Sequence, residues 1–473
     1  MITKYRFYAT MRAVVFSLCL VCSSTTLWAQ TVRSDYFLNN SQTRSSMNPA
    51  FRPNQGYLGV PFLSDIGVST YTNSLNLDHL VFERNGERVT FLHPAVSTSD
   101  FLSNLSDKNY LDVNAHYKFF TLGWYNKSKG FWTVELGART VADINIPRSV
   151  FDLMKGGFSE NENEAIDYSI LNLRASATVY AEAAVGYSKS LLEDQLQLGA
   201  KVKILLGIGN MELNVERLDI STLNGEWVAR SKATLAGAMK GIRPEYNGNS
   251  QFKTVEVDGA GLSGYGAGLD IGGAYKFLDN RAHVSLALTD LGFISWSKNN
   301  SMHLTAPETE VRIKPEGLGS LEGENDLTGQ FDVFKNDLRE VINFKDSGKG
   351  GRSTALRTNV NVGLAYEVWK NNLSLGVLSS TYMGYHTVSE FTVSANYNPV
   401  DIQWLSTALS YSAVHGKFNT VGFALHLAPS KGVCLFIGSD FILPHVNKDY
   451  IPTSGKAANF QFGLVIPLGK RVN

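Results

Sequence analysis

The chain of 473 residues is 44% hydrophobic and 18% charged, and its 43 basic residues balance 43 acidic ones. This composition argues against a disordered chain, a coiled coil and a highly charged nucleic-acid-binding protein, so we expect no nucleic-acid partner. The sequence has no run of about 18 apolar residues, which disfavours a helical membrane protein. The length fits about three soluble domains or one large β-barrel.

Residues 1–29 have the features of a secretory signal peptide. A basic start with Lys4, Arg6 and Arg12 precedes an apolar stretch over residues 13–22, and a cleavage site is expected after Ala29. A lipoprotein signal at Cys19 or Cys22 and a buried N-terminal helix are the alternatives. After cleavage only Cys434 remains, which rules out an internal disulfide and a cysteine-rich zinc site.

The exported part of the chain alternates between apolar and polar residues with a period of two. The alternation is clearest over residues 131–146, 171–187, 196–208 and 356–368. It predicts β-strands with one apolar face and one polar face. Several of these strands are about 15 residues long, whereas a strand that crosses a bilayer needs roughly 9–11 residues.

Fourteen strands are expected. They cover residues 57–71, 110–125, 131–146, 169–189, 195–216, 264–277, 282–296, 355–369, 373–381, 388–398, 403–414, 418–428, 433–442 and 457–468. Turns follow the even-numbered strands, while the long connections 72–109, 147–168, 217–263 and 297–354 follow odd-numbered ones. This pattern is typical of an all-β fold, a closed antiparallel transmembrane β-barrel in the bacterial outer membrane. A soluble β-sandwich is the alternative.

In such a barrel the apolar faces contact outer-membrane lipid and the polar faces line the lumen. The lumen-facing candidates are Glu135, Arg139, Asp143, Arg174, Glu182, Lys201, Lys203 and Glu367. Because both signs are mixed, we expect cross-strand pairs rather than an ion-selective pore. Phe120, Leu122, Tyr180 and Leu205 are also expected to face inward, where they would pack against a plug inside the lumen or line an apolar track.

Two long connections contain candidate helices. Phe331, Phe334, Leu338 and Val341 recur at helical spacing within residues 326–344, which predicts an amphipathic helix over the barrel mouth. Val150, Phe151 and Met154, after Pro147, predict a shorter helix. Either helix could instead pack only on its own loop.

Catalytic chemistry is poorly supported by the sequence. The glycines of residues 259–264 have the G-x-G-x-x-G spacing, but they lead into a predicted strand rather than a helix. His283 and Ser285 share one strand face, yet no third orienting residue is evident. The nine histidines show no metal-ligand spacing. We therefore expect no enzymatic activity, no catalytic residues, no cofactor and no metal.

Several segments resemble a known group of barrels. Residues 46–51, with Asn48-Pro49-Ala50, resemble the signature near the start of FadL-like barrels, and residues 268–276 with 284–296 are similar to a strand–turn–strand unit of FadL-like and PorV-like barrels. Together with residues 438–444 and 459–463, the order of these motifs resembles an uncharacterised outer-membrane barrel family of Bacteroidota, a domain of unknown function.

The FadL-like resemblance implies fourteen strands and an N-terminal segment inside the lumen. Residues 30–56 would then form the plug, with Asn48, Pro49 and Ala50 at its turn, and residues 57–473 the barrel. The implied function is binding or transport of a hydrophobic or amphipathic small molecule. The PorV-like resemblance implies the alternative, a non-transporting structural or secretion-accessory barrel that docks partner proteins.

Overall fold

The structure is a computed structural model, and it describes most of the chain after residue 31. The described residues are 32–471, apart from 76–79, 85–86, 94, 157–166, 224–225, 248–251, 314–341, 415–417, 430–431 and 443–456. The predicted signal peptide lies outside the described residues. Residues 326–341 of the predicted helix over 326–344 also lie outside them. No described helix is long and apolar enough to cross a membrane.

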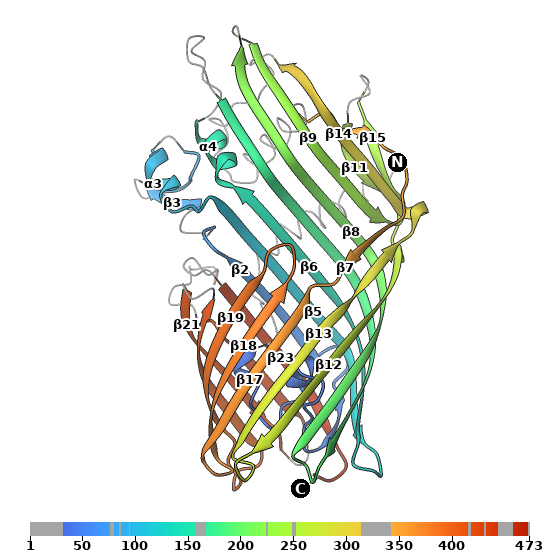
Figure 1. Cartoon of the computed structure of the whole chain (residues 1–473), viewed down its shortest axis with the longest axis vertical. Helices are drawn as coiled ribbons and strands as arrows, with labels where there is room; N and C mark the ends of the chain where they lie inside the picture. Colours follow the sequence, from blue (N-terminus) through green and yellow to red (C-terminus); the bar gives the residue numbers. More distant parts are fainter. Residues whose placement is uncertain are drawn as a thin grey trace.

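Fourteen strand positions form one closed antiparallel sheet (Figure 1). In order around the ring these are β1 (Gly56–Gly59) with β2 (Asp65–Thr72), β5 (Lys108–Tyr125), β6 (Phe131–Pro147), β7 (Asp167–Leu191), β8 (Leu196–Leu223), β12 (Gly264–Phe277), β13 (Ala282–Trp296), β16 (Arg352–Ala355) with β17 (Thr358–Trp369), β18 (Leu373–Met383), β19 (Val388–Tyr397), β20 (Leu405–Val414), β21 (Phe418–Leu427), β22 (Cys434–Ser439) and β23 (Ala457–Leu468). The predicted strand count is confirmed.

The ring closes where the first strand pairs with the last. Gly56 lies opposite Leu468 and Ile66 opposite Phe462, while the other edge of the same strand pairs Tyr57 with Gly123 on β5. A closed antiparallel sheet excludes the alternative of two sheets packed face to face. The predicted first strand, residues 57–71, is however broken in two by residues 60–64.

The two faces of the sheet have opposite chemistry. On β8, Val202 and Ile204 are 58% and 61% exposed on the outer face, whereas Lys201 and Lys203 are 3% and 2% exposed on the inner face. Exposed apolar side chains continue around the ring on β12, β13, β17, β19 and β20. Apolar residues outside a closed, internally hydrogen-bonded sheet match lipid, not water. The protein is therefore an outer-membrane β-barrel.

One strand face differs from the sequence-based expectation. The ladder between β5 and β6 slips between Lys118 and Phe120, and Thr121 then lies opposite the lumenal Glu135. Because one extra residue reverses all later side chains, Phe120 and Leu122 face outward rather than inward. Tyr180 and Leu205 do lie inside, buried with Trp296 and Leu356.

Strands β7 and β8 continue far beyond the barrel rim (Figure 1). β8 pairs with β12 as far as Gly207 and with β9 (Glu226–Met239) from Gly209 onward, and β9 pairs with β14 (Ser301–Ile313). The long connections 217–263 and 297–354 therefore contain strands that the sequence analysis did not predict. Adjacent Val228 and Ala229 in β9 are both buried, which weakens the alternation that reveals a strand.

A hydrophobic core covers one face of this extension. The smaller elements here are β3 (Val81–Arg84), β4 (Glu87–Thr90), α3 (Thr98–Leu102), α4 (Arg148–Gly156), β10 (Ile242–Tyr246), β11 (Phe252–Val257), η3 (Lys298–Asn300) and β15 (Lys345–Asp346). Phe91 and Phe101 stack at 4.3 Å, and Phe151 of α4 meets both rings edge-on. The predicted short helix is confirmed as α4, with Val150, Phe151 and Met154 buried.

Candidate functional site

Residues 32–55, named here the lumenal segment, lie inside the barrel (blue, lower part of Figure 1). The segment contains two short 3-10 helices, η1 (Arg33–Asp35) and η2 (Thr43–Ser46). Its start is fixed by Asp440, whose carboxylate accepts hydrogen bonds from the backbone of Arg33 at 2.7 Å and of Ser34 at 2.8 Å. The Arg33 guanidinium also pairs with Glu390 at 3.0 Å. These bonds tie the segment to the inner wall.

The turn Asn48-Pro49-Ala50 sits in a notch made by two glycines. Asn48 Oδ1 accepts a hydrogen bond from Ala50 N at 3.0 Å, which shapes the turn. Gly199 and Gly272 are cross-strand partners on β8 and β12. A Cβ on Gly199 would come within 2.1 Å of the Pro49 carbonyl oxygen, and one on Gly272 within 2.2 Å of Asn48 Oδ1. Only glycine allows the turn to approach the wall this closely.

Two aromatic residues complete the anchoring of the lumenal segment. The Tyr36 hydroxyl lies 3.0 Å from Ser285 Oγ, and the Phe37 ring lies 5.6 Å from the His283 ring. The sequence singled out His283 and Ser285 as a minimal hydrolase pair. In the structure they instead contact the lumenal segment.

Buried ion pairs fill the lumen beside this segment. Lys118 lies 3.2 Å from Asp65 and 3.1 Å from Glu135, and Lys201 bonds to Glu135 at 2.7 Å. Next to them on the same strands, Arg139 lies 2.9 Å from Asp290 and 3.4 Å from Glu182, and Lys203 bonds to Asp270 at 2.8 Å and Asp290 at 2.5 Å. We call these residues, with His116, the lumenal charge network.

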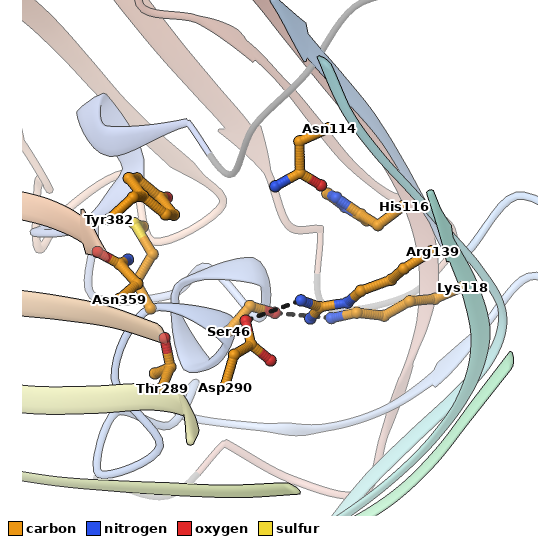
Figure 2. A pocket seen from close by; sticks show the side chains of 10 residues that line it. Ser46, Asn114, His116, Lys118, Arg139, Thr289, Asp290, Asn359 and Tyr382 are labelled. Atoms are coloured by element: carbon orange, nitrogen blue, oxygen red, sulfur yellow. Dashed lines mark hydrogen bonds and ion pairs between the residues drawn. The ribbon is translucent and has the colours of Figure 1, made fainter. Parts of the chain in front are cut away.

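The lumenal charge network reaches the lumenal segment directly. Lys118 Nζ donates to Ser46 Oγ at 2.6 Å, and Figure 2 shows this contact beside the Arg139–Asp290 pair. The cavity at this point has a volume of about 30 Å³. It has room for only a couple of water molecules. The lumenal segment and the lumenal charge network thus pack closely against each other at this point.

The predicted lumenal residues separate into three places. Glu135, Arg139, Glu182, Lys201 and Lys203 belong to the lumenal charge network. Asp143 and Arg174 lie higher, near the extracellular mouth: Asp143 is 3.5 Å from Arg357 and Arg174 is 2.5 Å from Glu212. Glu367 lies near the opposite end, where it accepts a hydrogen bond from Asn371 N in the β17–β18 turn.

Sequence reasoning missed Asp65, Lys118, Asp270 and Asp290. Asp290 has φ +58° and lies where the β12–β13 ladder slips, so a bulge turns its carboxylate inward. Its backbone N–H donates to Asp270 at 2.7 Å. An aspartate before Leu-Gly in a strand was a usable signal, because aspartate tolerates left-handed backbone better than most residues.

Burial changes the acid–base behaviour of the lumenal segment. Burial raises the pKa of Asp35 to about 7, although hydrogen bonds from Thr43 and Ser41 and the nearby Arg44 counteract the shift. The Ser41 hydroxyl donates to Asp35 Oδ2 at 2.8 Å, while buried Oδ1 has no hydrogen-bond partner among the described residues. Burial also lowers the pKa of Arg44 to about 10.

Comparison with known proteins identifies a family but no function. A model described as "Family of unknown function (DUF5723)" matches residues 49–440. No curated protein matches the sequence.

Some solved structures are similar in outline. The toluene transporter TodX of Pseudomonas putida is 9% identical, with 94% of this chain and 98% of that chain covered and a TM-score of 0.34. A TodX deltaS2S3 mutant, a monoaromatic hydrocarbon channel, is 9% identical over 91% of this chain and 94% of that chain, with a TM-score of 0.38. Salmonella typhi OmpF is 10% identical, with 88% of this chain and 98% of that chain covered and a TM-score of 0.24.

Replacing Lys203 should destabilise the barrel. In Lys203→Met the buried Asp270 loses its ion-pair partner, and removing one partner from a buried pair costs about 3–5 kcal/mol. Arg230→Met breaks an exposed pair with Glu310 and should cost under about 1 kcal/mol. Denaturant unfolding in detergent measures the free energy of unfolding of both variants. Equal decreases in that free energy would contradict a stabilising role for the lumenal charge network.

Docking of the lumenal segment should weaken as pH rises from about 4 to about 7. Docked Asp35 keeps its proton up to about pH 7, whereas a released aspartate loses it near its ordinary pKa of 3.8, so the docked state is favoured at low pH. Protease cleavage within the segment should therefore be faster at pH 8 than at pH 5. Asp35→Asn should reduce this difference. An unchanged pH dependence in that variant would show that another group is responsible.

Proposed function

The chain belongs to the family of unknown function DUF5723, and we propose that it is a gated conduit that carries a hydrophobic or amphipathic small molecule into the outer membrane. The observation that carries this proposal is a lumen occupied by the lumenal segment beside a kink in the first strand. The cavity where the lumenal segment meets the lumenal charge network is only about 30 Å³ in volume, and such close packing suits a gate better than an open pore for polar solutes.

The kink lies between β1 and β2. Its backbone is hydrogen-bonded to both neighbouring strands, because Val60 N donates to the Leu464 carbonyl oxygen at 2.9 Å and Phe62 N donates to the Phe119 carbonyl oxygen at 3.1 Å. Gly59 pairs with Val465, and Ile66 pairs with Phe462. The first strand therefore advances by seven residues between these two pairs, whereas β23 advances by only three. The surplus residues form a kink over residues 60–64, where Phe62 has φ +65° and is 69% exposed. The kink is folded tightly on itself, because a Cβ on Gly59 would meet Ser64 Oγ at 2.0 Å.

Lys118 connects the lumenal segment with the base of the kink. Lys118 bonds to Ser46 of the segment and to Asp65, the first residue after the kink. Movement of the lumenal segment would remove one of the bonds that hold Lys118 and would loosen the base of the kink. A path that opens through the wall leads into lipid, which selects for apolar or amphipathic molecules over polar ones.

Deleting Val60 to Leu63 tests the lateral path. The deletion removes the four surplus residues and would let β1 and β2 form one continuous strand. We expect uptake of a hydrophobic fluorescent dye to fall to the level of cells without the protein. A heat-dependent gel shift should show that the shortened barrel folds, and undiminished uptake by the folded variant would contradict the proposal.

Gly272→Ala tests the gate. The new Cβ would displace Asn48 from its notch, at a cost of about 1–3 kcal/mol in docking, so ion conductance in planar bilayers should rise. Gly273→Ala is the matched control, because its Cβ would meet only Leu198 Cδ2 at 3.2 Å and the Gln197 carbonyl oxygen at 3.5 Å. Equal conductance in both variants would contradict a gating role for the lumenal segment.

The second candidate function is a barrel that docks partner proteins without transport. It is favoured by the extension of β7, β8, β9 and β14, whose hydrophobic core lies beyond the barrel rim. A stoichiometric partner recovered from outer membranes, combined with dye uptake equal to that of cells without the protein, would favour this alternative. Dye uptake that depends on the kink would favour transport.

A further inference from the structure

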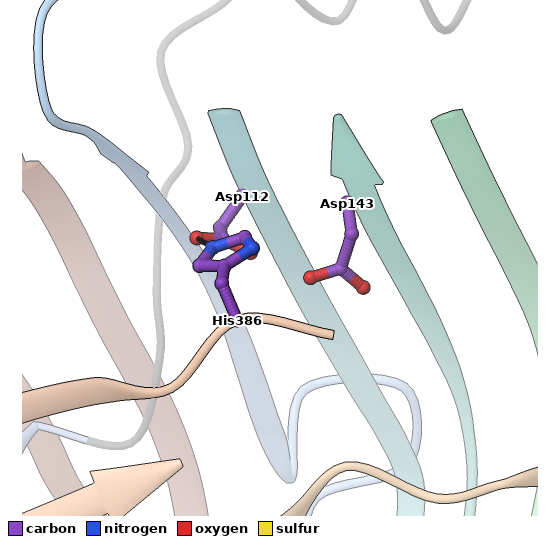
Figure 3. A group of neighbouring side chains, drawn as sticks. All are labelled: Asp112, Asp143 and His386. Atoms are coloured by element: carbon purple, nitrogen blue, oxygen red, sulfur yellow. Dashed lines mark hydrogen bonds and ion pairs between the residues drawn. The ribbon is translucent and has the colours of Figure 1, made fainter. Parts of the chain in front are cut away.

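Three side chains with metal-binding chemistry meet near the barrel mouth. Asp112 on β5, Asp143 on β6 and His386 in the β18–β19 loop place one ligand atom each within 4.8 Å of one another (Figure 3). Asp112 and Asp143 are direct cross-strand partners. His386 Nε2 lies 2.5 Å from Asp112 Oδ2.

The histidine arrives from the opposite wall. β18 is seven positions from β5 in the ring of fourteen, so residues 384–387 cross the mouth to reach β5. The loop is seated by two ring contacts: His386 stacks on Tyr110 at 4.3 Å, and the Arg174 guanidinium lies 3.9 Å from the Tyr385 ring. Below the loop, Tyr382 lines the small cavity above the lumenal segment. The cluster therefore sits where the mouth is bridged.

The charges of this cluster leave a place for a cation. Two carboxylates directly opposite each other on neighbouring strands repel. Arg357 Nη1 lies 3.1 Å from Asp112 Oδ1 and 3.5 Å from Asp143 Oδ1, which compensates one negative charge of the two. Hydrogen bonding is also incomplete, because buried Asp112 Oδ1, Asp143 Oδ1 and His386 Nδ1 have no hydrogen-bond partner among the described residues.

We propose that Asp112, Asp143 and His386 bind a divalent transition-metal ion, with Zn²⁺ as the best match, and that this ion fastens the β18–β19 loop across the mouth. One imidazole nitrogen and two carboxylate oxygens form a ligand set that zinc accepts, with water completing the coordination. Calcium takes six to eight oxygen ligands and fits this set poorly. The site closes the extracellular mouth and is separate from the gate at the lumenal segment.

Arg357 would compete with the metal ion for the carboxylates of Asp112 and Asp143. Its guanidinium carries the charge that the ion would supply, and it must move away from the carboxylates when the ion binds. The Tyr382 ring, 5.6 Å from the guanidinium carbon, offers a nearby aromatic surface for it. Loss of the Arg357 charge should therefore strengthen metal binding, whereas loss of any ligand should weaken it.

The test measures Zn²⁺ binding to the untagged full-length barrel in detergent by titration calorimetry. We expect one ion per chain and at least a tenfold weaker affinity in each of Asp112→Asn, Asp143→Asn and His386→Gln. Arg357→Gln should bind more tightly than the unmodified protein. His116→Gln is the matched control, because it breaks the lumenal His116–Asp65 pair at 3.2 Å and should leave zinc affinity unchanged.

A second measurement tests whether the metal ion fastens the β18–β19 loop. Chymotrypsin cleavage after Tyr385, which is 48% exposed, should slow on addition of Zn²⁺ in the unmodified protein and not in His386→Gln. Absence of saturable zinc binding would overturn the proposal, and so would binding that all three ligand variants retain. Weaker binding in Arg357→Gln would also overturn it. A heat-dependent gel shift confirms that each variant is folded, and the expected gain in Arg357→Gln does not depend on damaging the barrel.

Discussion

The closed ring of backbone hydrogen bonds is the constraint on which the other features depend. Lipid offers no donors or acceptors, so an open edge between β1, β2 and β23 would leave backbone groups unpaired. Closure forces every residue of the ring to face either lipid or lumen. The kink at residues 60–64 is the place where this ladder is interrupted in the first strand, and it lies beside the fixed contact between Lys118 and Asp65.

A narrow closed lumen also explains the buried charges. Polar side chains that point inward lose water when the lumenal segment enters, and they remain charged only if each has a partner. The segment itself fits because glycines at 199 and 272 remove side chains where its turn meets the wall. The proposed gating would therefore be linked to stability, since any motion of the segment disturbs contacts with Lys118 and Asp440.

Beyond the barrel rim the same sheet continues as an extension with a hydrophobic core. β8 exchanges β12 for β9 as its neighbour near Gly207, and the wall continues as a sheet with an ordinary hydrophobic core on one face. The β18–β19 loop bridges the mouth on the other side of the ring. The proposed metal site lies near the mouth and the lumenal segment lies deeper in the lumen, so the proposed conduit would have two barriers in series.

The sequence by itself determined the strand count, the long connections and the inward direction of Glu135, Arg139, Glu182, Lys201 and Lys203, because a period of two fixes both fold and face. Only the tertiary structure decided which charges meet. Asp112 and His386 are 274 positions apart, and a bulge, not the alternation, turns Asp290 inward. Alternation describes a strand face locally, whereas partners across a lumen depend on closure, register and slips that no short stretch of sequence contains.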